Sequence, residues 1–455
     1  MPPAQSANQV RIFANRTKLA ANASAAALPA LVEHITFCSN ITAADGNYIF
    51  GAVACPGLAD LTNNGTLAPW PTANQILERF SAEVKAAEYG HGYFTLTRTP
   101  DTMNVFNPSY PFLLNLWEGP VLQVPPRIVN EPPRTTGNDS SRFINSEDTI
   151  QVDIFGCDPF TGPSGKPLDF NEAADRVVYT AMNYARSPLG NVLGFGTFDA
   201  VMRPKFVEDK ILFTPTDSGH YSTQIPNCAF WPSCIPGTID YHYHILLSWM
   251  ATASGAYPPP LVASSCGSEM RYIVDLVCPV PVPRRAVRPA VLPVAPVSSS
   301  YWEGDILGTV QYPDGVKFMV AEFQATFGNQ SVGMQLREMS LRYGWVLVWS
   351  YYANHDPRRI VDPYVAAKST LNLTIPSAVA TAFETQWTAA NATWYSTGTN
   401  AAAATQWATL VNATLTPGIN DALLWNIGVR DCEDYDNCIG VVDSTGDCAC
   451  YKATE

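Results

Sequence analysis

The spacing of apolar residues along the chain predicts several amphipathic helices. Thr72 is a residue type that caps helices, and apolar residues at 76, 77, 80 and 84 follow it on one helical face until Gly90. Asp169, with Glu172 three positions later, resembles a capping box and predicts a helix through Ala173, Val177, Ala181 and Ala185. The remaining predicted helices are residues 377–387 and 400–413, with a further candidate over 18–32 that Pro29 interrupts.

Short runs rich in β-branched and aromatic residues predict a comparable number of strands. Residues 306–312 and 316–323 flank the turn sequence Pro313-Asp314-Gly315, which predicts a hairpin. Alternating residues from 335 lead into the dense apolar run 345–349, which predicts one long strand over 335–352. The other predicted strands are residues 47–54, 92–98, 149–155, 210–213, 241–247 and 272–277.

Many strands, a handful of helices and long connections predict an α+β fold with predominantly antiparallel sheets, a few amphipathic helices and long proline-rich crossings. Six prolines between positions 279 and 297 exclude helix and interior strand there and favour an extended segment. Shorter crossings of this kind are expected at 125–134 and 258–260. The predicted organisation is an N-terminal α+β region (1–278), a proline-rich extended linker (279–300), a β-hairpin plus helical region (301–430) and a cysteine-rich tail (431–455).

Composition narrows the classes of function. Hydrophobic residues make up 47% of the 455 positions and charged residues 15%, so the chain can fill a large core and is not disordered. The net charge is −13 and the basic residues are scattered, so we expect no sequence-specific nucleic-acid partner. Eight lysines stand against 19 arginines, and arginine suits packed interfaces whereas lysine is the usual solvated surface charge. Codon or lineage bias is the alternative explanation.

Targeting features point in two directions. The first residues lack a basic start followed by an apolar stretch, so no secretory signal is predicted, and no apolar run approaches the roughly 20 residues of a membrane span. The chain nevertheless has nine Asn-x-Ser/Thr triplets, whereas chance would give roughly four such acceptors. This surplus indicates a glycosylating compartment. The glycosylation candidates are Asn15, Asn22, Asn40, Asn64, Asn138, Asn329, Asn372, Asn391 and Asn412.

The eleven cysteines leave at least one thiol unpaired in a monomer. No C-x2-C pair is present, which argues against a zinc ribbon. The group between 432 and 450 is compatible with disulfides that fix a small C-terminal loop region, and buried free cysteines are the alternative.

The sharpest local signal for chemistry is Asp240, His242 and His244, which would share one face of a predicted strand. Two imidazoles with a carboxylate beside them can ligate zinc or a similar ion. The residues that could complete such a site are His220, Asp217 and Cys228. An ordinary sheet surface or interface is the alternative, because the intervening tyrosines alternate as on any amphipathic strand.

Other functional motifs give weaker signals. The acidic group Asp431, Glu433, Asp434 and Asp436 offers oxygen ligands for calcium but lacks the spacing of an EF-hand loop, so a solvated acidic loop is the alternative. The chain contains no zinc-protease motif, nucleophile elbow, phosphate-binding loop or dinucleotide fingerprint. We therefore predict no catalytic residues and no cofactor, apart from the metal ion just discussed.

Two classes of function fit these observations. The first is a self-assembling structural protein such as a virus capsid or shell subunit, whose partners are copies of itself and other shell proteins, and which lies in a virion or another extracellular assembly. Low charge, abundant arginine and apolar proline-rich arms favour it, while the lack of a basic arm argues against direct binding of the genome. The second is a secreted or cell-surface glycoprotein that acts as a binder or a metal-dependent hydrolase. The acceptor triplets and the clustered cysteines favour this alternative.

Overall fold

The computed structural model describes residues 5–40, 72–85, 94–98, 111–113, 155, 175–182, 198–215, 235–254, 256–266, 302–323, 330–351, 358–371, 373–397, 405–410, 420, 423, 438–442 and 448–452. Within these residues the fold is α+β: one mostly antiparallel sheet, a separate two-stranded sheet and several helices. The predicted fold class is therefore confirmed.

The main sheet has eight strands in the order β4-β5-β2-β1-β3-β6-β7-β8. All neighbours are antiparallel except β6 and β7, which are parallel and are joined by the helix α14. The small sheet is an antiparallel pair of β9 and β10. The strands are β1 (Phe94–Arg98), β2 (Val178–Met182), β3 (Phe198–Met202), β4 (Ile211–Thr214), β5 (Glu303–Ile306), β6 (Val316–Glu322), β7 (Val346–Tyr351), β8 (Arg358–Val361), β9 (Cys438–Val442) and β10 (Cys448–Lys452).

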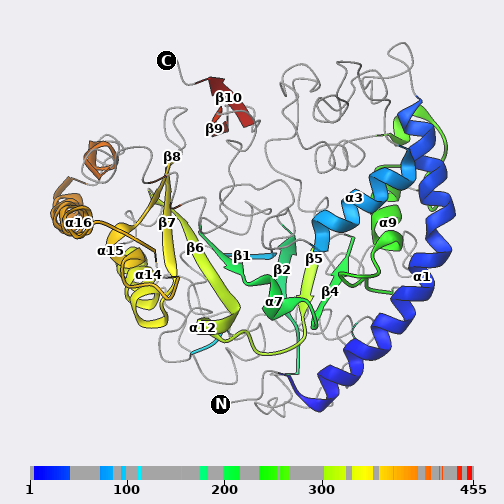
Figure 1. The fold of residues 1–455 in the computed structure, drawn as a ribbon, viewed down its shortest axis with the longest axis horizontal. Helices are drawn as coiled ribbons and strands as arrows, with labels where there is room; N and C mark the ends of the chain where they lie inside the picture. Colours follow the sequence, from blue (N-terminus) through cyan, green and yellow to red (C-terminus); the bar gives the residue numbers. More distant parts are fainter. Residues whose placement is uncertain are drawn as a thin grey trace, which may run out of the picture.

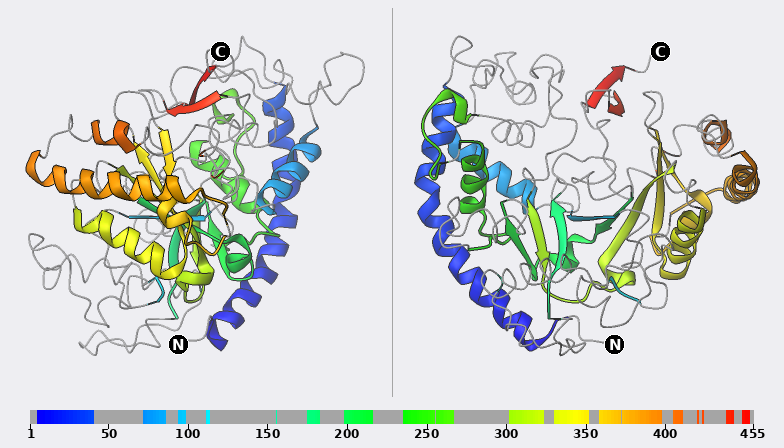
Figure 2. Two further views of the ribbon diagram at one scale, coloured as in Figure 1. Left: turned by 60° about the vertical axis from the view of Figure 1, so that its left-hand side comes forward. Right: turned by 180° about the vertical axis from the view of Figure 1, so that it is seen from behind.

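Helices gather at the two opposite ends of this strand order (Figure 1). The long α1 (Ala7–Ser39) lies outermost at the β4 end, with α3 (Ala73–Lys85) and α9 (Tyr243–Ser254) against it. At the β8 end lie α14 (Gln330–Tyr343), α15 (Pro363–Ala366) and α16 (Ser377–Thr397), as the reverse view in Figure 2 also shows. The short elements are α7 (Pro204–Val207), η5 (Ala263–Ser265) and α12 (Tyr312–Gly315).

Strands β6 and β7 are buried on both faces. In β7, Leu347 and Trp349 belong to the large core cluster, whereas Val346 and Val348 belong to a second cluster. Alternate residues of a strand point to opposite faces, so the two clusters lie on opposite sides of the sheet. This explains why the run 345–349 is apolar without alternation, as is typical of strands covered on both sides.

Local sequence explains where the principal helices begin. The Ser6 side chain accepts a hydrogen bond from the Gln9 main chain, and the Gln9 side chain accepts one from the Ser6 main chain, which completes a capping box at α1. At α3, the Thr72 hydroxyl accepts from the Gln75 main chain at 3.3 Å. The residues predicted for the apolar face of α3 are all buried, and the helix predicted from Ser377 is α16.

Several local predictions are wrong. The helix predicted through residues 169–185 is contradicted at β2, because residues 178–182 form a strand between β1 and β5. The strand predicted over 241–247 is instead the beginning of α9. Pro29 does not interrupt its helix, which extends over 33 residues as α1. Residues 335–343 belong to α14, so only the second half of the predicted strand 335–352 is extended.

The predicted hairpin over 306–323 is also wrong. Pro313, Asp314 and Gly315 form the helical turn α12 rather than a reverse turn, and β5 and β6 are separated in the sheet by β2, β1 and β3. Strands from both sides of the predicted linker 279–300 share this one sheet. The linker itself, the crossing at 125–134 and the predicted strands at 47–54 and 272–277 lie outside the described residues. None of the described helices combines the length and apolarity that crossing a lipid bilayer requires.

Candidate functional site

The segment that contains Asp240, His242 and His244 enters α9 through a tight approach to β4. Gly237 exchanges main-chain hydrogen bonds of 2.9 Å with Phe213 on that strand. A Cβ atom at Gly237 would lie 2.6 Å from the Ile245 side chain and 3.1 Å from the Tyr241 carbonyl oxygen, so only glycine fits there without displacement. Asp240 and His242 lie in the segment before α9 and His244 in its first turn, so the three predicted ligands do not share a strand face.

His242 is buried and both of its ring nitrogens have hydrogen-bond partners. Nδ1 lies 3.0 Å from the Ile239 carbonyl oxygen, which only accepts, so Nδ1 carries the proton. Nε2 then accepts from the Ser81 hydroxyl of α3 at 3.1 Å, and this hydroxyl is also 3.1 Å from the Tyr243 hydroxyl. Burial is the largest cause that lowers the pKa of His242, to about 4, and the nearby His244 and Lys85 add to the effect. The ring is neutral at pH 7.

His244 points to a different main-chain group. Its Nε2 donates to the Ile235 carbonyl oxygen at 3.0 Å, and its buried Nδ1 has no hydrogen-bond partner among the described residues. Burial lowers the pKa of His244 to about 4, while the main chain at Ile235 and Pro236 opposes the shift. Asp240 is exposed and pairs with Lys85 at 2.9 Å.

This geometry gives no support to a shared metal site at Asp240, His242 and His244. Each imidazole bonds to its own carbonyl oxygen, and the carboxylate lies at the surface with a lysine. The residues proposed to complete the site, His220, Asp217 and Cys228, lie outside the described residues, as does the acidic group Asp431, Glu433, Asp434 and Asp436. The metal assignment at these positions stays a prediction of the sequence.

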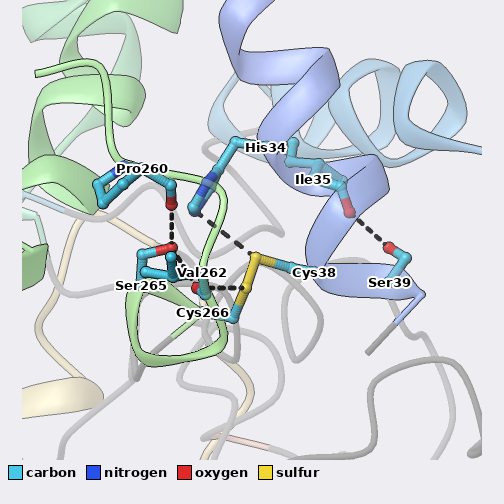
Figure 3. Close-up of a disulfide and its surroundings, with 8 residues drawn as sticks. All are labelled: His34, Ile35, Cys38, Ser39, Pro260, Val262, Ser265 and Cys266. Atoms are coloured by element: carbon cyan, nitrogen blue, oxygen red, sulfur yellow. Dashed lines mark hydrogen bonds between the residues drawn. A yellow bond between two sulfur atoms is a disulfide. The ribbon is translucent and has the colours of Figure 1, made fainter. Parts of the chain in front are cut away.

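The structure brings another set of metal-ligating side chains together at the end of α1. His34, Cys38 and Cys266 are buried, and their ligand atoms all lie within 4.8 Å of one another. Within the described parts of the chain, no other three histidine, cysteine or acidic side chains gather in this way. Cys38 and Cys266 form a disulfide that spans 228 positions of sequence, with the two Cα atoms 5.5 Å apart (Figure 3).

Two elements position these three residues. His34 and Cys38 are four residues apart on α1, so they lie on one face, and His34 Nε2 is 3.6 Å from Cys38 Sγ. Cys266 directly follows η5, where the Ser265 hydroxyl donates within the turn to the Pro260 and Val262 carbonyl oxygens (Figure 3). Burial lowers the pKa of the His34 imidazole, and the main chain at Ser265 opposes this shift. A neutral imidazole is the form that binds metal ions.

The sequence signal for this cluster was the four-residue spacing of His34 and Cys38, which fits the period of a helix. Local spacing brings only His34 and Cys38 together, however, and nothing in the sequence shows that Cys266 is their neighbour. The predicted disulfides of the tail 431–455 concern side chains outside the described set.

A network of buried charged side chains lies at the other end of the sheet. Arg337 of α14 donates to the Asp362 carboxylate at 2.8 Å and also to Glu384 of α16. The Trp349 indole donates to Asp362 at 3.2 Å, and the Arg337 guanidinium lies over the Trp387 ring at 4.7 Å from its centroid. Asp362 is also the N-cap of α15. Every partner belongs to a packed element, so this network joins β7, α14, α15 and α16.

Of the nine glycosylation candidates, the structure describes the side chains of Asn15, Asn22 and Asn40, and all three are exposed on α1 or at its C-terminal cap. Asn391 falls within α16. The other five lie outside the described residues.

No model of a known protein family matches the chain, and no curated protein matches it.

Proposed function

We propose that this protein is the subunit of a self-assembling shell of the kind that forms a virus capsid. The observation that carries the proposal is the placement of exposed apolar side chains at opposite ends of the sheet. On α1, Val10 is 53% exposed and Leu19 42% exposed. On α14, beyond the other end of the sheet, Met334 is 54% exposed and Leu341 37% exposed.

Exposed apolar side chains at both ends of the sheet suit repeated association. When different surfaces of identical subunits meet head to tail, the contact propagates, and it closes into rings or shells if the geometry allows. Met334 and Leu341 are seven residues apart and therefore lie on one face of α14. The scarcity of lysine, eight residues against 19 arginines, is also typical of surfaces that become interfaces.

The test measures particle mass by light scattering and sedimentation over a range of protein concentrations. We expect the wild-type chain to form particles much larger than a monomer, and we expect Leu19→Glu or Met334→Glu to shift it towards small species. Thr36→Glu is the matched control, because Thr36 is an exposed polar position of α1. A wild-type chain that stays monomeric at all concentrations would contradict the proposal.

A secreted glycoprotein is the second candidate, and the acceptor asparagines on α1 favour it. Asn15 and Asn22 are exposed and lie on the same face of the helix as Leu19, because the spacings are four and three residues. The buried disulfide between Cys38 and Cys266 also suits an oxidising compartment.

The two candidates use the Leu19 face of α1 in mutually exclusive ways. A glycan on Asn15 or Asn22 is bulky and would cover the face that assembly needs. Peptide mass spectrometry of the native protein therefore separates them. Occupied glycans at Asn15 and Asn22 would exclude assembly through this face, whereas unmodified asparagines in a large particle would support it.

A further inference from the structure

Once its disulfide is reduced, the cluster at the end of α1 offers two thiol sulfurs and one imidazole, which are ligand types that Zn²⁺ prefers. We propose that His34, Cys38 and Cys266 form a zinc site when the disulfide is reduced. The site would use His34 Nε2 and the two Sγ atoms, and a water molecule would hold the fourth position. This inference does not depend on the proposed function, because it concerns the connection between α1 and η5 alone.

The His34–Cys38 pair already has the separation that zinc requires. With Zn–S of about 2.3 Å and Zn–N of about 2.05 Å in a tetrahedron, the ligand nitrogen and sulfur lie about 3.6 Å apart. His34 Nε2 and Cys38 Sγ are 3.6 Å apart in the structure. Two thiolates on the same ion lie about 3.8 Å apart. The sulfurs must therefore separate by about 1.8 Å after the bond of about 2.0 Å is broken.

Burial favours this site over an open thiol pair. Cys38 is fully buried, Cys266 is 2% exposed and His34 is 1% exposed. After reduction, the thiols are only weak hydrogen-bonding groups, so the buried His34 Nε2 has a weak partner in Cys38 unless it binds an ion. Zn²⁺ binds both thiolates and imidazoles, so one ion can coordinate all three groups at once.

The change of state balances in two steps. A thiol reductant supplies two electrons and two protons, which break the Cys38–Cys266 bond and give two thiols, while the reductant becomes its own disulfide. Zn²⁺ then binds the two thiolates and the His34 nitrogen, and the two thiol protons pass to solvent. The C-terminal end of α1 is linked to the residue after η5 in both forms, by the disulfide bond in the oxidised form and by the zinc ion in the reduced form.

The experiment uses the full chain after reduction by a phosphine, which with one water molecule supplies the same two electrons and two protons and becomes a phosphine oxide; the excess is then removed. Zinc per chain is measured by metal analysis, and Co²⁺ is added separately as a spectroscopic probe of thiolate ligation. The comparison variants are the double substitution Cys38→Ser with Cys266→Ser, and His34→Gln. Because nine other cysteines are present, only the difference between variants is interpreted.

We expect reduced wild-type protein to hold one more zinc per chain than the equally reduced double variant. We expect His34→Gln to weaken zinc binding by at least 10- to 100-fold, since even loss of an outer-shell partner costs that much. The matched control is Thr36→Ala, an exposed position of α1 between two of the ligands, which should bind as wild type does. Equal zinc content in the reduced wild-type protein and the reduced double variant, or unchanged affinity in His34→Gln, would overturn the proposal.

Discussion

Asp362 is a buried carboxylate that serves three elements, and we expect its removal to be the most damaging change at the β8 end of the sheet. It accepts from Arg337 at 2.8 Å and from the Trp349 indole at 3.2 Å, and it caps α15 through the Val365 main chain at 3.1 Å. Asp362→Ala would leave the Arg337 guanidinium buried, with the half-buried Glu384 as its remaining ionic partner among the described residues.

The magnitude follows from burial. Breaking a buried ion pair by removing one partner costs about 3–5 kcal/mol, because the other charge stays in the interior. Loss of an N-cap side chain costs about 1 kcal/mol more. The free energy of unfolding should therefore fall by about 4 kcal/mol or more. Asp240→Ala is the matched control, because its pair with Lys85 is nearly as short, at 2.9 Å, but exposed. It should cost less than about 1 kcal/mol.

The assay is urea unfolding followed by tryptophan fluorescence, to which Trp349 and Trp387 beside the network contribute. A lower midpoint with an unchanged slope would show that stability alone has changed. The reasoning would be refuted if Asp362→Ala and Asp240→Ala lowered the free energy of unfolding by similar amounts. Equal effects would mean that burial of the pair does not determine its contribution.

The other predictions concern three further sites. The pKa of His244 is about 4 in the fold, against an ordinary value of 6.5. Its contribution of about 3 kcal/mol to the free energy of unfolding is therefore fully present above pH 6.5 and is lost as the pH falls towards 4. Urea unfolding at pH 7 and pH 5 should show a smaller pH dependence in His244→Asn. Replacing Cys38 and Cys266 by serine opens a link across 228 positions, and thermal and urea unfolding should show a loss of up to about 5 kcal/mol by loop-closure entropy. Gly344 has a φ of +74°, and a Cβ there would lie 2.5 Å from a threonine methyl group. Gly344→Ala should therefore lower the free energy of unfolding by about 1–2 kcal/mol in the same assay. An unchanged free energy of unfolding would contradict the strain argument.

Helices with a polar side were predictable because their apolar spacing agrees with their packing. In α3, Ile76, Leu77 and Phe80 follow a capping threonine and are buried as expected. In α16, Phe383 and Trp387 are one turn apart and both enter the core. In each case, local preference and tertiary packing favour the same structure.

Elements that are buried on several sides were not predictable from spacing. In α9, residues 245–251 are all buried because α1 and the sheet enclose the helix, so no polar face marks its period. Its aromatic and β-branched residues then favoured a strand. For residues 178–182 the error is the opposite one, because a helix was predicted and the residues form a strand. A short apolar run fits a helix or a strand, and pairing with β1 and β5 decides between them.

The candidate site was only half predictable for a similar reason. The spacing of His34 and Cys38 is local, and any helix would bring them to one face. Cys266 joins them only because α9 packs along α1 and the chain then turns through η5. The same packing explains why His242 and His244 face separate hydrogen-bond partners. Their position at the start of α9 directs each ring to a carbonyl oxygen of the turn that precedes it.

The redox state of Cys38 and Cys266 and the modification of α1 depend on the same property of the compartment. A compartment that glycosylates Asn15 and Asn22 is oxidising, so glycans should occur together with the disulfide. A reducing compartment leaves both asparagines unmodified and favours the zinc form, so zinc should occur together with an uncovered Leu19 face. Protein isolated with both glycans and site-bound zinc would contradict this coupling. Measuring both properties on one native sample therefore tests this coupling and helps to distinguish the two candidate functions.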